Sequence, residues 1–310
     1  MFKILSLDGG GSKGVYSLGV LFEIEKRLGS SLYNHFDYFY GCSTGAIIAS
    51  ALAMKKTIEE IKVLYIEKIP KVMKCFSATK RSQSLRKVLE EYFGKEIRFD
   101  AFTKHVGIVA TMVEDRAPRI FKTNRDAAFG RKATFIEGFG CTIAEALLAS
   151  CAANPFFNDI RLYDKNNKTY FTCRDGGYCA NNPTLFAIID ALKPLDIDKK
   201  DLIVINIGTG DFPRSHNIRL NIGSCKHVLS KDLILDMFDT SSNTNASIVK
   251  YLLDDINILR ISDSDSHPSL KTNILEYNIE KLEKIFLRGR KSFGDAEDFF
   301  KKLFPEAYKG

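Results

Sequence analysis

A serine lies between two glycines in the segment Gly41–Gly45, GCSTG, which fits the pattern G-x-S-x-G. The glycines permit a sharp turn that would hold the hydroxyl of Ser43 exposed at the end of a strand, above the N-terminus of the next helix. A serine held in this way can attack an acyl carbonyl. The pattern alone also fits an ordinary turn of small residues, so the interpretation depends on the groups around it.

Three consecutive glycines, Gly9–Gly11, lie in the segment DGGGSKG at residues 8–14. A glycine-rich turn after a strand presents backbone N–H groups that could stabilise an oxyanion, backed by a helix that starts near Ser12. The same geometry could cradle a phosphate. The segment fits neither G-x-x-x-x-G-K-[ST] nor G-x-G-x-x-G. Together with Ser43, the loop favours an oxyanion hole; the alternative is a nucleotide- or phosphate-binding module in which Ser43 is structural.

A serine nucleophile needs a base. The segment RDGG places Asp175 at the end of an expected strand, before Gly176 and Gly177. In isolation an Asp–Gly pair is more often a hairpin turn. Beside the two other glycine motifs, we interpret Asp175 as the general base.

Histidines offer an alternative base, since a Ser–His–Asp triad needs a histidine that reaches the serine. Three of the five histidines follow Asp175 in the chain: His216, His227 and His267. None of them lies in a recognisable turn. We therefore favour the aspartate without excluding the triad.

The elements that would position these residues alternate along the chain. A buried strand is expected at residues 2–8, and further strands are expected at 35–43, 106–114, 119–123, 168–177 and 201–210. Amphipathic or apolar helices are expected at residues 14–29, 44–54, 57–69, 83–94 and 142–153. This alternation predicts an α/β fold with three layers, α/β/α, and a mostly parallel central sheet. We expect one domain over 1–310, with a catalytic core at about 3–210 and a helical elaboration at about 211–310.

Composition limits the class of protein. The 310 residues are 45% hydrophobic and 27% charged, with a net charge of +7, which suits a folded domain and anionic partners without itself indicating nucleic acid. The seven cysteines include no C-x-x-C pair, so we expect reduced thiols in a cytoplasmic protein and no zinc site. The apolar run at 46–54 is too short for a membrane span. We expect a soluble enzyme without metal or cofactor.

The ordered motifs DGGGSKG, GCSTG and DGGYCANNP, with ASCAANPFF at 149–157, resemble the patatin-like phospholipase family over about residues 3–210. The resemblance implies a Ser–Asp dyad that hydrolyses acyl esters of phospholipids or lysophospholipids. It implies Ser43 as nucleophile, Asp175 as base and Gly9–Gly11 as oxyanion hole. The other motif positions that it marks are Asp8, Lys13, Gly14, Gly41, Gly45, Gly176 and Gly177. The family commonly has arginine at the position of Lys13. Lysine keeps the positive charge but cannot form the bidentate hydrogen bonds of a guanidinium.

Residues 55–87 carry ten lysines and arginines against three glutamates, an excess equal to that of the whole chain. Within this basic segment, residues 69–84 also hold Val72, Met73 and Phe76. Such a segment could bind anionic headgroups as a peripheral membrane contact. It could equally be a solvated helix face with a core stripe.

The resemblance extends to compact bacterial members of the family, which act as membrane-degrading effectors of antiphage signalling and are switched on by cyclic nucleotides. It therefore implies a cyclic nucleotide activator, and it leaves a homo-oligomer open. The sequence locates no activator site.

Overall fold

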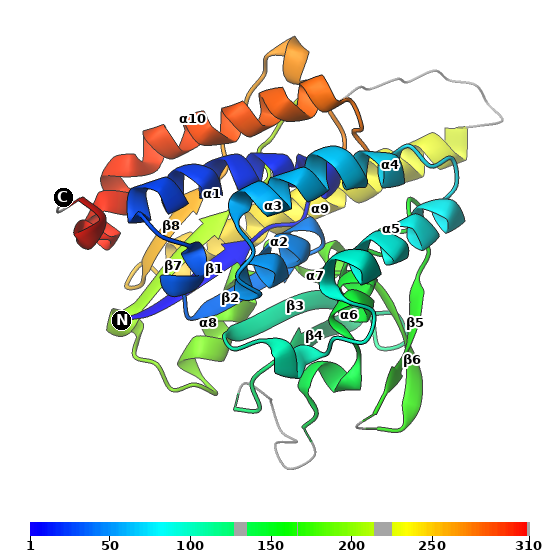
Figure 1. Cartoon of the computed structure of the whole chain (residues 1–310), viewed down its shortest axis with the longest axis horizontal. Helices are drawn as coiled ribbons and strands as arrows, with labels where there is room; N and C mark the ends of the chain where they lie inside the picture. The colour runs from blue at the N-terminus through cyan, green and yellow to red at the C-terminus, as the bar shows by residue number, and fades with distance from the viewer. Residues whose placement is uncertain (127–134, 166, 214–224, 309–310) are drawn as a thin grey trace.

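The computed structural model describes residues 1–126, 135–165, 167–213 and 225–308. Within these ranges one sheet of eight strands runs through the molecule in the order β5-β6-β3-β2-β1-β7-β8, and β4 also pairs with β3 (Figure 1). The strands are β1 Phe2–Leu7, β2 Tyr38–Cys42, β3 His105–Met112, β4 Ala117–Lys122, β5 Ile160–Asp164, β6 Thr169–Asp175, β7 Leu202–Ile207 and β8 Asn257–Ile261. Strands β3, β2, β1, β7 and β8 are parallel, whereas β4, β5 and β6 pair antiparallel.

Helices cover both faces of the sheet. The helices are α1 Gly14–Leu28, α2 Thr44–Ala53, α3 Ile58–Val63, α4 Ile69–Met73, α5 Ala78–Phe93, α6 Ile143–Ser150, α7 Gly177–Ala180, α8 Thr184–Leu192, α9 Cys225–Leu252 and α10 Ile279–Leu303. Helices α1, α2, α5, α6 and α10 share one core with Leu5 and Leu7 of β1. Helix α8 and the C-terminal part of α9 share the other core with Ile4. The predicted three-layer fold with a mostly parallel sheet is confirmed.

The helix ends follow local signals. Gly29 ends α1 in the left-handed conformation, and Thr57 and Glu60 form a capping box at the start of α3. Ser77 caps α5 by accepting a hydrogen bond from the Lys80 N–H, so this helix begins before the expected 83–94. The expected helix 57–69 continues through a π-helical turn, Leu64–Lys68, into α4.

Two strands were not anticipated. β5 forms a hairpin with β6 at one edge of the sheet, and β8 forms the other edge, inside the C-terminal region that was expected to be mostly helical. Among the described residues, no helix combines the length and apolar character needed to cross a membrane.

Candidate active site

The carboxyl ends of β1 and β2 bring two of the glycine motifs together. The two strands are parallel neighbours in a register that pairs Leu7 with Gly41, so the loops that follow them leave the sheet side by side. Gly45, in the first turn of α2, packs directly on the Leu7 carbonyl, and a Cβ there would collide with it. This close approach fixes α2 against β1 and sets the position of the turn at Ser43.

Ser43 forms the sharp turn between β2 and α2. Its backbone has φ 51° and ψ −123°, an uncommon conformation for a residue with a side chain. The Ser43 N–H donates to Ser150 Oγ over 2.8 Å, and the Ser150 hydroxyl donates to the Val109 carbonyl over 2.5 Å. Helix α6 and strand β3 therefore hold the turn in place. Ser150 lies in the small-residue segment ASCAANPFF, where no sequence pattern indicates this role.

Asp175, the last residue of β6, lies beside Ser43. The Ser43 hydroxyl donates to Asp175 Oδ2 over 2.8 Å, and the Gly177 N–H donates to Oδ1 over 2.7 Å. The carboxyl is 1% exposed. Its burial raises the pKa of Asp175 to about 7, against the opposing effect of the hydrogen bonds from the Gly177 N–H and the Ser43 hydroxyl. The group can thus hold a proton and release it near neutral pH.

Of the three histidines of the alternative triad, the structure describes the side chain of His267 alone, and this residue does not line the Ser43 cavity. His267 is exposed and its ring bonds Ser269. His216 lies outside the described residues, and His227 lies at the start of α9, where side chains are not described.

Two residues of the glycine loop line the same site. The Gly9 N–H already donates to the Asn181 carbonyl over 2.9 Å. The N–H groups of Gly10 and Gly11 have no acceptor in the described part of the chain. Both residues line the cavity that holds Ser43 and Asp175, and Gly11 has a φ of 59°, which favours glycine. The expected set of three amide donors is therefore narrowed to Gly10 and Gly11.

The other motif residues support the loops from outside the cavity. Lys13 ends a 3₁₀ turn, Gly11–Lys13, and Gly14 opens α1. Gly176 packs against Val109 and Cys42. These residues fix the positions of the three loops.

Asp8 is held by partners that the sequence motifs do not contain. It is 2% exposed and forms an ion pair with Arg260 over 2.9 Å. The Asn206 side-chain amide donates to Asp8 Oδ1 over 2.8 Å, and the Ser242 hydroxyl donates to Oδ2 over 3.3 Å. Burial raises the pKa of Asp8, while the attraction of Arg260 lowers it. These contacts anchor the residue that directly precedes the glycine loop.

The cavity around Ser43 is apolar and small. Its volume is about 40 Å³, and its walls are mostly the side chains of Ile47, Tyr65, Ile69, Met73, Leu85 and Phe238. Such walls suit a hydrocarbon chain. The volume, however, is only that of a few water molecules, so an acyl chain could enter only if the walls moved apart. Among the described residues, no group of three His, Cys, Asp or Glu side chains is placed to hold a metal ion.

Comparison with known proteins decides the family. The model of the patatin-like phospholipase family matches residues 5–188, which is more than half of the chain. The chain belongs to the patatin-like phospholipase family. It is therefore a lipid acyl hydrolase by family, and a phosphate-binding module without hydrolysis is not favoured.

Individual relatives agree with this assignment. A cUMP-AMP-activated phospholipase from Escherichia coli is 43% identical over 296 residues, which cover 95% of this chain and 91% of the relative. A cGAMP-activated phospholipase from E. coli strain TW11681 is 29% identical, and the match covers 67% of this chain and 62% of the relative. The fold is also shared with VipD from Legionella pneumophila, with a TM-score of 0.52 and 13% identity over 96% of this chain and 66% of VipD.

Proposed function

We propose that this phospholipase hydrolyses acyl esters of phospholipids or lysophospholipids with Ser43 as nucleophile and Asp175 as general base. The observation that carries the proposal is the 2.8 Å hydrogen bond from the Ser43 hydroxyl to the buried Asp175 carboxylate. This is the distance at which a base can take the proton of an attacking hydroxyl. Gly10 and Gly11 line the same cavity as Ser43 and Asp175, and their N–H groups are the proposed oxyanion donors.

The proposed reaction has two halves. Ser43 Oγ attacks the ester carbonyl carbon while its proton moves to Asp175, and the carbonyl oxygen becomes an oxyanion facing the Gly10 and Gly11 amides. The C–O bond to the leaving alcohol then breaks, and Asp175 gives that alcohol the proton. A water molecule then attacks the acyl-enzyme carbonyl while Asp175 takes its proton. The bond between the acyl carbon and Ser43 Oγ breaks, Asp175 returns the proton to Oγ, and the fatty acid leaves. All groups involved belong to this chain or to substrate and water.

A fluorophosphonate probe tests this assignment directly, because it reacts only with an activated serine. We expect stoichiometric labelling of wild type at Ser43 after any activating ligand has been added, in EDTA as well as without it, and none in Ser43→Ala. Lipid extracts incubated with each protein would then show which ester is cleaved. A native protein that labels at another serine, or that requires a divalent cation to label, would refute the proposed dyad chemistry.

The pH profile follows from the buried base. Asp175 must be deprotonated to accept the serine proton, and its raised pKa of about 7 means that it gains a proton as the pH falls through neutrality. We expect kcat/KM to decline about tenfold per unit below pH 7. Activity that stays constant down to pH 5 would contradict a base of this pKa.

We also propose that the basic segment meets the membrane. Val72 and Met73 are buried, so that part of the segment is core. Phe76, between α4 and α5, is 96% exposed. Around it lie exposed lysines that pair with no carboxylate among the described residues: Lys68, Lys71, Lys74 and Lys80. Because Ile69 and Met73 of α4 also line the Ser43 cavity, this surface adjoins the site that a lipid must reach.

Phe76→Ser should weaken binding to anionic vesicles about tenfold or more, since burying a phenylalanine side chain is worth about 1.5–3 kcal/mol. Sedimentation with phosphatidylglycerol vesicles measures this. Tyr170→Ser is the matched control, because Tyr170 is also an exposed ring but lies outside the basic segment. Equal vesicle binding by wild type and Phe76→Ser would exclude this surface.

We further propose that the enzyme is restrained until a cyclic dinucleotide activates it. Support comes from the 40 Å³ cavity, which is too small for an acyl chain, and from the relative that is named for activation by cUMP-AMP. A cytoplasmic phospholipase of this kind would be an antiphage effector that degrades the cell's own membrane.

The chain would act as one domain, since β7 and β8, on either side of residue 211, join the same sheet. Self-association and the exact domain limits stay predictions.

A further inference from the structure

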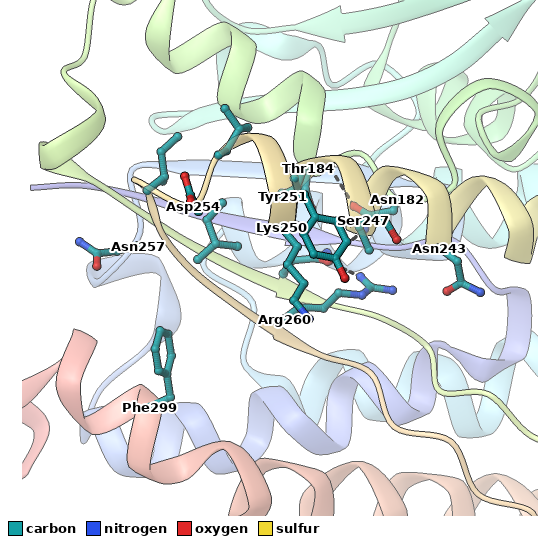
Figure 2. A pocket seen from close by; sticks show the side chains of 16 residues that line it. Asn182, Thr184, Asn243, Ser247, Lys250, Tyr251, Asp254, Asn257, Arg260 and Phe299 are labelled. Carbon is teal, nitrogen blue, oxygen red and sulfur yellow. Dashed lines mark hydrogen bonds between the residues drawn. The ribbon is translucent and has the colours of Figure 1, made fainter.

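A second and much larger cavity lies at the β8 edge of the sheet. Its volume is about 750 Å³, within the range of cavities that hold small organic ligands. It is formed by the C-terminal half of α9, by β8, and by the segment that leads into α8. Figure 2 shows Asn243, Ser247, Lys250 and Tyr251 along α9, with Phe299 standing on α10. None of its lining residues lines the Ser43 cavity.

The chemistry of this second cavity differs from that of the catalytic one. The side chains of Asn243, Ser247 and Asn257 make no hydrogen bond to any described residue, so their donors and acceptors are available to a ligand. Lys250 and Arg260 supply two cations against the single carboxylate of Asp254.

Two exposed rings complete this lining. Tyr251 and Phe299 are 72% and 42% exposed. Amide side chains bond base edges, aromatic rings stack on bases, and lysine and arginine bind phosphates. A ligand with bases and phosphodiesters would use all three kinds of group at once.

We infer that this second cavity is the binding site of a cyclic dinucleotide. The inference rests on the proposed function, because it gives a location to the activator proposed above. A cyclic dinucleotide carries two bases and two phosphodiesters, which match the rings, amides and cations around a cavity of this size.

Arg260 connects this site to the catalytic loop. Its guanidinium faces the second cavity and also bonds Asn206 and the carboxylate of Asp8. Asp8 directly precedes Gly9, so a phosphate that binds Arg260 would change the contacts that position the oxyanion loop.

Helix α9 provides a second connection. Ser242 bonds Asp8 over 3.3 Å and accepts from the Asn181 amide over 3.1 Å. One turn earlier on the same helix, Phe238 forms part of the Ser43 cavity wall and packs edge-on against Tyr178, with ring centroids 5.1 Å apart. A ligand that shifts the C-terminal half of α9 would therefore move this wall, and an acyl chain needs such a movement to enter.

Calorimetric titration with cUMP-AMP and with cGAMP tests the location. We expect one ligand to bind wild type and Ser43→Ala alike. Lys250→Glu reverses a charge of the cavity and Ser247→Trp fills it, and each should weaken binding at least tenfold. Lys168→Glu is the matched control, because it makes the same charge change at the exposed β5–β6 hairpin on the opposite edge of the sheet. Unchanged melting temperatures without ligand would confirm that the variants fold.

The outcomes separate the two proposals. If a dinucleotide binds and activates wild type but both cavity variants bind it equally well, the location is wrong and the proposed activation stands. If the dinucleotide binds and the cavity variants lose it, yet wild type never hydrolyses lipid, the location stands and the proposed function fails. If neither dinucleotide binds wild type, the inference is overturned.

Discussion

Ser43→Ala is expected to lower phospholipid hydrolysis by at least about 10⁴-fold, the scale on which serine hydrolases lose turnover when the nucleophile is removed. The alanine leaves no atom to form the acyl-enzyme, while the Gly10 and Gly11 amides and the apolar cavity remain. Release of fatty acid from vesicles, measured after any activating ligand has been added, would quantify the loss. The variant should bind that ligand as wild type does.

Ser50→Ala is the matched control for this loss. Ser50 is fully buried on the same helix, α2, and its hydroxyl has no hydrogen-bond partner among the described residues. Removing an unpaired buried hydroxyl should leave activity and stability nearly unchanged or raise stability slightly. If Ser43→Ala kept activity within tenfold of Ser50→Ala, another residue would have to be the nucleophile.

The parts of the site that could be predicted from the sequence are those whose signal is local. Ser43 and Asp175 each sit where a strand ends and glycines follow, and the turn geometry is encoded in those few residues. The alternation of strands and helices along the chain likewise predicted the three-layer α/β/α arrangement. The pairing of the two side chains across 2.8 Å confirms that these separate segments meet.

The parts that were missed depend on contacts between distant segments. Strand β8 contains the charged residue Arg260, which an apolar strand pattern would not include. The charge is tolerated there because it pairs with Asp8, which is distant in the sequence. Neither residue indicates the other by spacing. The Gly9 N–H could not be removed from the oxyanion donors beforehand either, since its acceptor is the carbonyl of Asn181.

Removing the base is expected to lower turnover by at least ~10², the usual effect of losing a positioned general base. Asp175→Asn keeps the shape of the side chain, and its amide oxygen can still accept from the Gly177 N–H. An amide cannot take the Ser43 proton, however, so attack must proceed from a neutral hydroxyl. Turnover at saturating lipid, measured at pH 8 where the wild-type carboxyl is mostly ionised, would show the loss most clearly.

The stability of Asp175→Asn provides its control. Because burial raises the folded-state pKa of Asp175 above its ordinary value, ionising this carboxyl destabilises the fold increasingly as pH rises from about 4 toward 7. The neutral asparagine avoids that cost, so its melting temperature at pH 8 should not fall below that of wild type. If Asp175→Asn keeps its melting temperature but loses turnover, the loss has a catalytic cause and does not result from misfolding.

Single replacements of His216, His227 and His267 by alanine complete the comparison with Asp175→Asn. A dyad predicts that each keeps most of the activity, because a carboxylate already receives the Ser43 hydrogen bond. The pH profile cannot make this distinction, since a base with a pKa of about 7 titrates where histidine does. The variants do make this distinction. If Asp175→Asn kept its turnover and replacement of one histidine abolished turnover, the result would support a Ser–His–Asp triad and contradict the dyad.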